Sequence, residues 1–208
     1  MDARSDAHRQ GAQRWKFLFL AALFFVPLGL SFLWYYGLTE LRPDAGVQRG
    51  ELIHPARPLP QLTLPLATGG TTASAFLERT WTLLYLAPGP CDQTCRARIT
   101  ELRQLRLALG RESNRVTGVL LYTGPAPDRN WLETEHTGLI AASLEDLDDR
   151  DRMLTPFPGG DNPAALMAAG RVYLVDPNGN LMMAYPAGTP LKDIHEDLKR
   201  LMRLSRIG

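Results

Sequence analysis

Residues 81–110, WTLLYLAPGPCDQTCRARITELRQLRLALG, place a cysteine pair between a buried strand and an amphipathic helix. The first seven residues, 81–87, form an unbroken apolar run of strand length, which is typical of a strand buried on both faces. Pro-Gly-Pro ends that run. From Cys95 to Leu109 the apolar residues recur with helical period, and Gly110 suits the C-terminal cap. The stretch therefore predicts a strand, a cysteine loop and a helix, in that order.

The segments on either side continue the pattern of a layered α/β fold. Residues 115–123, RVTGVLLYT, form a second apolar run, so strand, helix and strand predict a right-handed crossover in a parallel sheet. Before the cysteine stretch, residues 61–67, QLTLPLA, alternate in polarity and predict a short strand. Between 124 and 170 we expect two short helices and a loop at TPFPGGDNP, residues 155–163.

The C-terminal segments complete a recognisable order of elements. Residues 171–186, RVYLVDPNGNLMMAYP, contain two strands around a Pro-Asn-Gly turn, which predicts a β-hairpin. Residues 190–204 have one apolar helical face, with Thr189 as the expected N-cap. A parallel unit with a cysteine loop, then a hairpin and a helix, is the thioredoxin-like plan. We predict an α/β fold with a thioredoxin-like domain over residues 60–208.

The composition excludes several classes of function. The chain has 208 residues and a formal charge of +1, and it has no basic stripe interleaved with aromatic residues, so we expect no nucleic-acid partner. Two cysteines allow at most one disulfide. The four histidines are scattered, without metal-ligand spacing, which argues against a structural zinc site; they are His8, His54, His136 and His195.

The N-terminal segment predicts a membrane anchor. Residues 15–38, WKFLFLAALFFVPLGLSFLWYYGL, carry no charge after Lys16 and are long enough to cross a hydrocarbon core about 30 Å thick. Aromatic residues at both ends match the two interfaces of a bilayer. The alternative is a cleaved secretory signal, which would have a shorter apolar run and a small-residue cleavage site. The long run ending in bulky aromatics favours a retained anchor.

The distribution of charge predicts the orientation of that anchor. Four basic residues precede the apolar run or open it and three follow it closely, a slight positive-inside bias. We therefore expect residues 1–14 to be a cytoplasmic tail, 39–59 a linker, and the C-terminal domain periplasmic or equivalent. The expected location is a single pass through the inner (plasma) membrane. A disulfide can persist on that side.

The spacing of Cys91 and Cys95 allows three kinds of chemistry. At i and i+4 near the start of a helix they share one face, with Cα atoms about 6 Å apart, which a disulfide accepts. Two thiolates can also hold one soft ion such as Cu(I). A helix N-terminus lowers the pKa of a nearby thiol and raises its reactivity. The alternative is a structural disulfide, although closing so short a loop yields little entropy.

The sequence resembles the Sco/SenC family of membrane-anchored, thioredoxin-like proteins that serve copper delivery to cytochrome c oxidase. The likeness covers roughly residues 60–205 and rests on the single anchor, on CDQTC after the WTLLYLA strand, and on YLVDPNGNL. The resemblance implies that Cys91 and Cys95 bind Cu(I) or act as a redox pair. It also implies a membrane location and an oxidase subunit or another assembly factor as partner.

The sequence departs from the family pattern at two places. Arg96 stands where the family motif CxxxCP has proline. The segment before the hairpin, NPAALMAAG, lacks the histidine that is the family's third copper ligand, so the third ligand is open between Met167 and His136. A general thiol oxidoreductase would carry a cis-proline before the hairpin, where this chain has Ala169 and Gly170.

Three functional hypotheses follow. The first is an assembly factor or metallochaperone for a respiratory oxidase, acting through Cu(I) or through thiol-disulfide exchange at the cysteine pair. The second is a general membrane-tethered thiol-disulfide oxidoreductase. The third is a partner-binding domain whose disulfide is structural. Whether the chain is an enzyme depends on which of these holds.

Overall fold

The computed structural model describes residues 15–16, 19–33 and 49–205. The chain divides into two units, residues 1–47 and 48–208. In the first unit, residues 15–16 and 19–33 are helical and their side chains are exposed. The predicted anchor also includes residues 17–18 and 34–38, which lie outside the described residues. Within the described residues, no helix has both the length and the hydropathy that crossing a membrane requires.

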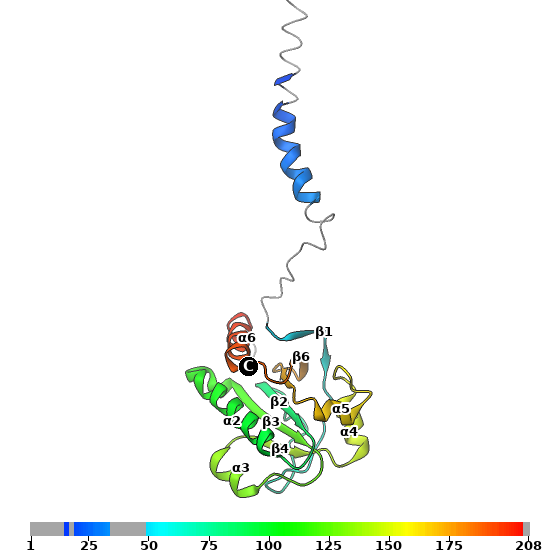
Figure 1. The fold of residues 1–208 in the computed structure, drawn as a ribbon, viewed down its shortest axis with the longest axis vertical. Coiled ribbons are helices and arrows are strands. Elements are labelled where there is room, and N and C mark those ends of the chain that lie inside the picture. The colour runs from blue at the N-terminus through cyan, green and yellow to red at the C-terminus, as the bar shows by residue number, and fades with distance from the viewer. Residues whose placement is uncertain (1–14, 17–18, 34–48, 206–208) are drawn as a thin grey trace, which may run out of the picture. The chain divides into compact units, whose positions relative to one another are not determined.

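The second unit is built on one mixed six-stranded sheet with the order β1-β6-β5-β2-β3-β4 (Figure 1). Strands β2, β3 and β4 are parallel, β5 and β6 form an antiparallel hairpin, and β1 pairs with β6 at the edge. The strands are β1 Glu51–Pro58, β2 Trp81–Ala87, β3 Val116–Tyr122, β4 Ile140–Ser143, β5 Val172–Val175 and β6 Asn180–Tyr185. The helices are α2 Gln93–Ala108, α3 Arg129–Glu135, α4 Leu147–Leu154, α5 Pro163–Ala168 and α6 Leu191–Leu204, with a 3₁₀ helix η2 at Gly110–Arg115.

Strand β2 divides the core because its side chains alternate between two layers. Leu83 and Tyr85 belong to a cluster with the buried faces of α2 and α6, whereas Leu84 and Leu86 belong to a cluster with α4 and α5. Figure 1 shows α2 and α4 on different sides of the sheet. Both cysteines belong to the first cluster.

The central elements confirm the predicted plan. Strand β2 spans the predicted 81–87, pairs in parallel with β3, and is joined to it by α2. Gly110 has φ +60° just after the C-cap of α2, as expected of a helix-ending glycine. The hairpin of β5 and β6 also forms as predicted.

The predicted strand at 61–67 is wrong. Those residues make only isolated bridges, at Pro65 and Leu66. The strand lies earlier, at β1, within the segment predicted as a linker. Its prolines are tolerated because β1 is an edge strand, paired on one side only and through an irregular register.

The other differences are local. The two short helices expected between 124 and 170 are α3 and α4, but β4 and α5 were not predicted. The N-cap of α6 is Pro190 rather than Thr189, whose hydroxyl donates instead to the carbonyl of Pro186 at 2.8 Å. The last helix therefore begins without a side-chain cap.

Candidate functional site

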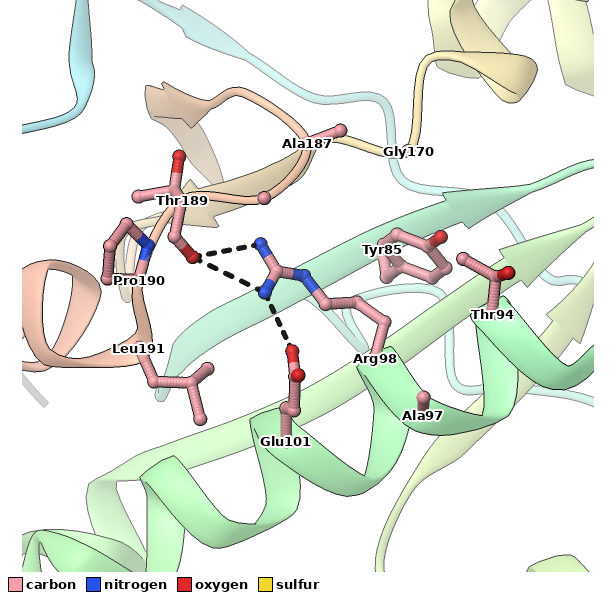
Figure 2. A pocket seen from close by; sticks show the side chains of 11 residues that line it. Tyr85, Thr94, Ala97, Arg98, Glu101, Gly170, Ala187, Thr189, Pro190 and Leu191 are labelled. Atoms are coloured by element: carbon pink, nitrogen blue, oxygen red, sulfur yellow. Dashed lines mark hydrogen bonds and ion pairs between the residues drawn. The ribbon is translucent and has the colours of Figure 1, made fainter.

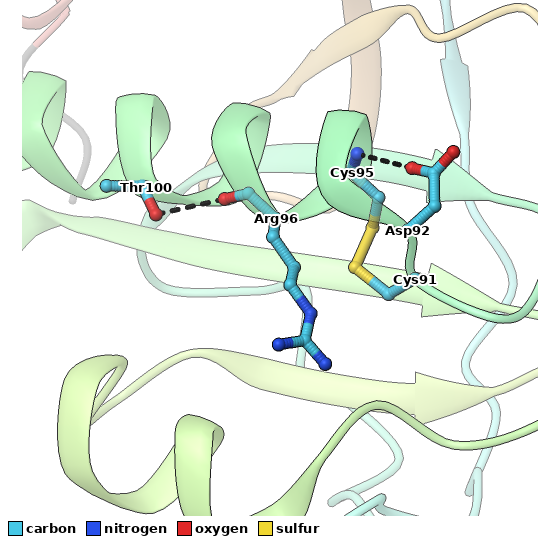
Figure 3. Close-up of a disulfide and its surroundings, with 5 residues drawn as sticks. All are labelled: Cys91, Asp92, Cys95, Arg96 and Thr100. Carbon is cyan, nitrogen blue, oxygen red and sulfur yellow. Dashed lines mark hydrogen bonds between the residues drawn. A yellow bond between two sulfur atoms is a disulfide. The ribbon is translucent and has the colours of Figure 1, made fainter.

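The two cysteines form a disulfide at the N-terminus of α2 (Figure 3). Cys91 lies in the loop after β2 and Cys95 in the first turn of the helix, with Cα atoms 5.2 Å apart. Both residues are buried, 6% and 4% exposed. The structure thus brings the predicted pair together. Because both cysteines are buried, exchange requires the surrounding loop to move enough for a partner thiol to reach a sulfur atom.

The loop that carries Cys91 is held by a close backbone approach. A Cβ atom added to Gly89 would overlap the carbonyl oxygen of Thr123, in the loop after β3. Thr123 in turn donates its N–H to the carbonyl of Ala87 at 3.3 Å. The two loops at the carboxyl ends of β2 and β3 therefore depend on glycine at position 89.

Asp92 caps the helix that carries Cys95. Its carboxylate accepts the Cys95 backbone N–H at 2.9 Å, the usual arrangement of an N-cap aspartate. The sulfur atoms lie beside the positive end of the α2 dipole, which favours a thiolate over a thiol. The capping carboxylate opposes that effect with its own charge.

A cation and an aromatic ring lie beside the disulfide. The Arg96 guanidinium is 5.3 Å from the centroid of the Trp131 ring, and Trp131 packs against the cluster that contains both cysteines. In Figure 3 the Arg96 side chain leaves α2 on the same side as the disulfide. Arg96 is the residue that replaces the proline of the family motif.

A cavity of about 340 Å³ opens between α2 and the loop from β6 to α6 (Figure 2). Tyr85 and Arg98 are its two largest buried polar residues, 5% and 9% exposed. Burial is the main cause that raises the pKa of Tyr85, and Arg98 partly opposes it. The lining residues are Tyr85, Thr94, Ala97, Arg98, Glu101, Gly170, Ala187, Gly188, Thr189, Pro190 and Leu191.

The two candidate third ligands lie in different parts of the domain. Met167 is 3% exposed and belongs to the cluster on the face of the sheet opposite the cysteines, although it lines a cavity with Pro88. His136 is the C-cap of α3 and its ring packs at a tilt against Trp131, with ring centroids 4.2 Å apart. In the described part of the chain, no three His, Cys, Asp or Glu residues gather as a metal site.

The surroundings of His136 are apolar and cationic. Its Nε2 is buried without a hydrogen-bond partner, and it lines a small cavity with Arg103 and Arg106. Burial, followed by the charge of Arg103, lowers the pKa of His136. A neutral imidazole is therefore favoured at this position.

A family model described as "Transmembrane-like, thioredoxin-like, C-terminal domain" matches residues 81–205. The chain belongs to this thioredoxin-like family. The match covers the cysteine loop, the hairpin and α6, which are the elements that carried the sequence prediction. No curated protein matches the sequence.

Solved structures share the thioredoxin-like fold at low sequence identity. ScoI of Arabidopsis thaliana with copper bound aligns at 16% identity and TM-score 0.55, over 69% of this chain and 97% of that one. A thiol:disulfide interchange protein of Chlorobium tepidum aligns at 15% and 0.53, over 70% and 95%. BsSco, described as a member of the Sco family of cytochrome c oxidase assembly proteins, aligns at 18% and 0.53, over 74% and 99%. The resemblance to Sco proteins is thus confirmed at the level of the fold.

Sequence reasoning missed the cavity that Tyr85 and Arg98 line. Arg98 and Tyr85 were not among the predicted site residues, since neither belongs to a motif. One signal was present: Arg98 follows Cys95 by three residues, so it lies close to the apolar stripe of α2. A charged residue at such a position is rarely buried unless it has a partner.

Proposed function

We propose that this thioredoxin-like protein exchanges disulfides with a partner through Cys91 and Cys95. The observation that supports the proposal is the disulfide at the N-terminus of α2, directly after the central strand of the fold. The helix end favours the thiolate that exchange requires. The general oxidoreductase remains the weaker alternative, because Ala169 and Gly170 stand where such an enzyme would have its cis-proline.

The exchange runs through a mixed disulfide. A partner thiolate attacks Sγ of Cys91, so that a partner–Cys91 bond forms while the Cys91–Cys95 bond breaks and Cys95 leaves as a thiolate. A second partner thiolate then attacks the partner sulfur and releases Cys91. The partner is oxidised to a disulfide, both cysteines here are reduced, and the two thiolates take up protons. The reverse sequence reduces a partner disulfide, with Cys91 attacking and Cys95 resolving.

The reduced pair also suits Cu(I) as a cargo. Two thiolates from one helix end are soft ligands, and within the described residues no group of three or more His, Cys, Asp or Glu is arranged to hold a metal ion. That donor set fits Cu(I) and fits Cu(II) poorly, since Cu(II) prefers nitrogen and oxygen ligands in a tetragonal arrangement. Met167 and His136 stay the predicted candidates for a third ligand.

The proposed setting is the outer side of the inner membrane. The apolar run 15–38 would be the anchor, with residues 1–14 cytoplasmic and the thioredoxin-like domain periplasmic or equivalent; helical residues 19–33 with exposed apolar side chains support this. BsSco is described as belonging to a family of cytochrome c oxidase assembly proteins. We propose by analogy that the partner is an oxidase subunit or another assembly factor. In this proposal the chain acts as an assembly factor or metallochaperone rather than as a general enzyme.

The redox proposal is tested by the reduction potential of the pair. The full chain, in an uncharged detergent, is equilibrated in glutathione buffers and the free thiols are counted. We expect one reversible two-electron transition between about −120 and −270 mV, the range of exchanging thioredoxin-fold pairs, and no transition in Cys91→Ser. A potential below about −300 mV would make the bond a structural disulfide.

The copper proposal is tested by a competitive Cu(I) titration of the reduced full chain without oxygen. We expect one Cu(I) per chain, lost in Cys91→Ser and in Cys95→Ser, and no comparable binding of Cu(II). Met167→Leu and His136→Gln then test the third ligand, because loss of affinity in either variant identifies it. Absence of tight Cu(I) binding would leave disulfide exchange as the function.

A further inference from the structure

The cavity between α2 and the loop from β6 to α6 contains a buried cation, Arg98 (Figure 2). The Arg98 side chain is 10% exposed. Its Nη1 donates to a Glu101 carboxylate oxygen at 2.8 Å, and Nη1 and Nη2 each approach the Thr189 carbonyl at only 3.4 Å. A guanidinium has five N–H donors, and contacts as long as 3.4 Å are weak. Nη1 thus has a strong acceptor in Glu101, whereas Nη2 has only the weak contact to the Thr189 carbonyl.

The remaining polar groups of the cavity are chiefly donors. Tyr85 makes no hydrogen bond to the described residues, and its hydroxyl lies 3.9 Å from the position a Cβ of Gly170 would take. Because burial raises the pKa of Tyr85, its phenol stays protonated and can donate. Thr94 adds a second hydroxyl to the lining. Glu101 is the one acidic side chain there, and at 44% exposure it lies at the rim.

We infer that this cavity binds a carboxylate of the partner polypeptide, received by Arg98 and Tyr85. This inference rests on the proposed exchange at Cys91 and Cys95 and names the chemistry that selects its substrate. A carboxylate accepts two parallel N–H bonds from a guanidinium, so it would supply the acceptors that Thr189 supplies poorly. In doing so it would displace the exposed Glu101.

The geometry also sets where that carboxylate lies in the partner. Arg98 follows Cys95 by three residues, about 4.5 Å along the helix axis, and its side chain extends toward the loop at Thr189. An extended partner segment advances about 3.3 Å per residue. The partner sulfur is joined to Cys91, in the loop just before this helix, so a carboxylate a few residues from the partner cysteine is placed to reach Arg98, either on an acidic side chain or at a chain terminus.

The test compares three peptides as reductants of the full chain in an uncharged detergent. They are acetyl-Cys-Ala-Glu-Ala amide, the same peptide with Gln for Glu, and acetyl-Cys-Ala-Gln with a free carboxyl terminus. We expect the Glu peptide to react about tenfold faster than its Gln counterpart. Arg98→Gln should reduce that ratio to about one. The free-acid peptide shows whether a terminal carboxylate serves equally well.

Two further variants distinguish carboxylate binding in the cavity from general electrostatic attraction of an acidic peptide. Arg96→Gln removes a cation two residues away that lies over Trp131 rather than in the cavity, so the Glu-to-Gln ratio should persist. Glu101→Gln removes the internal competitor and should raise the ratio; it keeps the proposal testable if Arg98→Gln does not fold. Equal rates for both amidated peptides in the wild-type chain and in Glu101→Gln would overturn the inference.

A binding measurement distinguishes failure of this inference from failure of disulfide exchange. The Glu peptide with Ser in place of Cys cannot exchange, but it should shift the Arg98 Nε–H resonance in an NMR titration with saturation. The matching Gln peptide should not. A saturable shift together with no exchange by any Cys peptide would keep the carboxylate site and refute the redox function. Exchange with the Cys peptides but no shift with the Ser peptide would keep the redox function and refute the carboxylate site.

Discussion

At the scale of single residues, His136 makes the stability of the domain depend on pH. Burial and Arg103 lower its pKa in the folded state, while the unfolded chain has the ordinary value of about 6.5. Below that pH the His136 imidazole binds a proton more readily in the unfolded chain than in the folded one, so the free energy of unfolding falls as the pH drops. The charge of Glu135 partly opposes the shift.

We therefore expect His136→Gln to flatten the acid side of the stability curve. Urea unfolding at pH 8 measures the packing cost of the substitution alone, because the imidazole is neutral in both states there. Between pH 6.5 and 5 the wild type should lose more stability than His136→Gln. Equal slopes would mean that the imidazole titrates alike in the folded and unfolded chain.

At the scale of elements, Asp197 ties the start of β1 to α6. Its carboxylate is 3% exposed and accepts the backbone N–H groups of Arg49 and Gly50 at 2.9 and 3.1 Å and the Tyr185 hydroxyl at 3.3 Å. Burial is the first cause that raises the pKa of Tyr185, and Asp197 adds to it, so this phenol stays a donor. One carboxylate thus joins the edge strand, the hairpin and the last helix.

Asp197→Asn should lower the free energy of unfolding by about 1–3 kcal/mol, because a neutral amide oxygen is a weaker acceptor for these three donors than a charged carboxylate. Asp193→Asn is the control: it loses an ion pair to the half-exposed Arg49 and should cost under about 1 kcal/mol. Hydrogen exchange should speed up at β1 in Asp197→Asn only. A similar loss in both variants would show that Asp197 contributes no more than a surface charge.

The elements also show which parts of the fold a single sequence can predict. Strand β2 and helix α2 were predicted because each repeats one signal over many residues, an apolar run or a helical period. Strand β1 has no such signal, since seven of its eight residues are exposed and its pairing comes from β6. The short α5 has one turn and a half, too few residues to show a period.

The candidate site divides in the same way. The pairing of Cys91 with Cys95 follows from their local spacing, so it could be predicted. The role of Arg98 depends on Thr189, 91 residues away along the chain, and on a cavity that exists only once α6 has docked. No local pattern contains that information.

At the scale of the whole molecule, a thiol-disulfide function depends on the compartment. Disulfides persist outside the reducing cytosol, so exchange with the proposed partner on the outer side of the membrane requires the thioredoxin-like domain on that side. The orientation predicted from the charges around residues 15–38 places it there. The predicted membrane orientation and the proposed side of disulfide exchange therefore depend on each other, and one labelling experiment tests both.

We expect a cysteine in the domain to react with a membrane-impermeant maleimide in intact spheroplasts of a bacterial host. The reporter is Ser74→Cys, at an exposed position in the segment between β1 and β2, in a Cys91→Ser/Cys95→Ser chain. Ser5→Cys in the same chain is the matched control, and it should be labelled only after lysis. The opposite pattern would place the cysteine pair in the cytosol, which would refute the predicted orientation and the proposed partner on the outer side of the membrane.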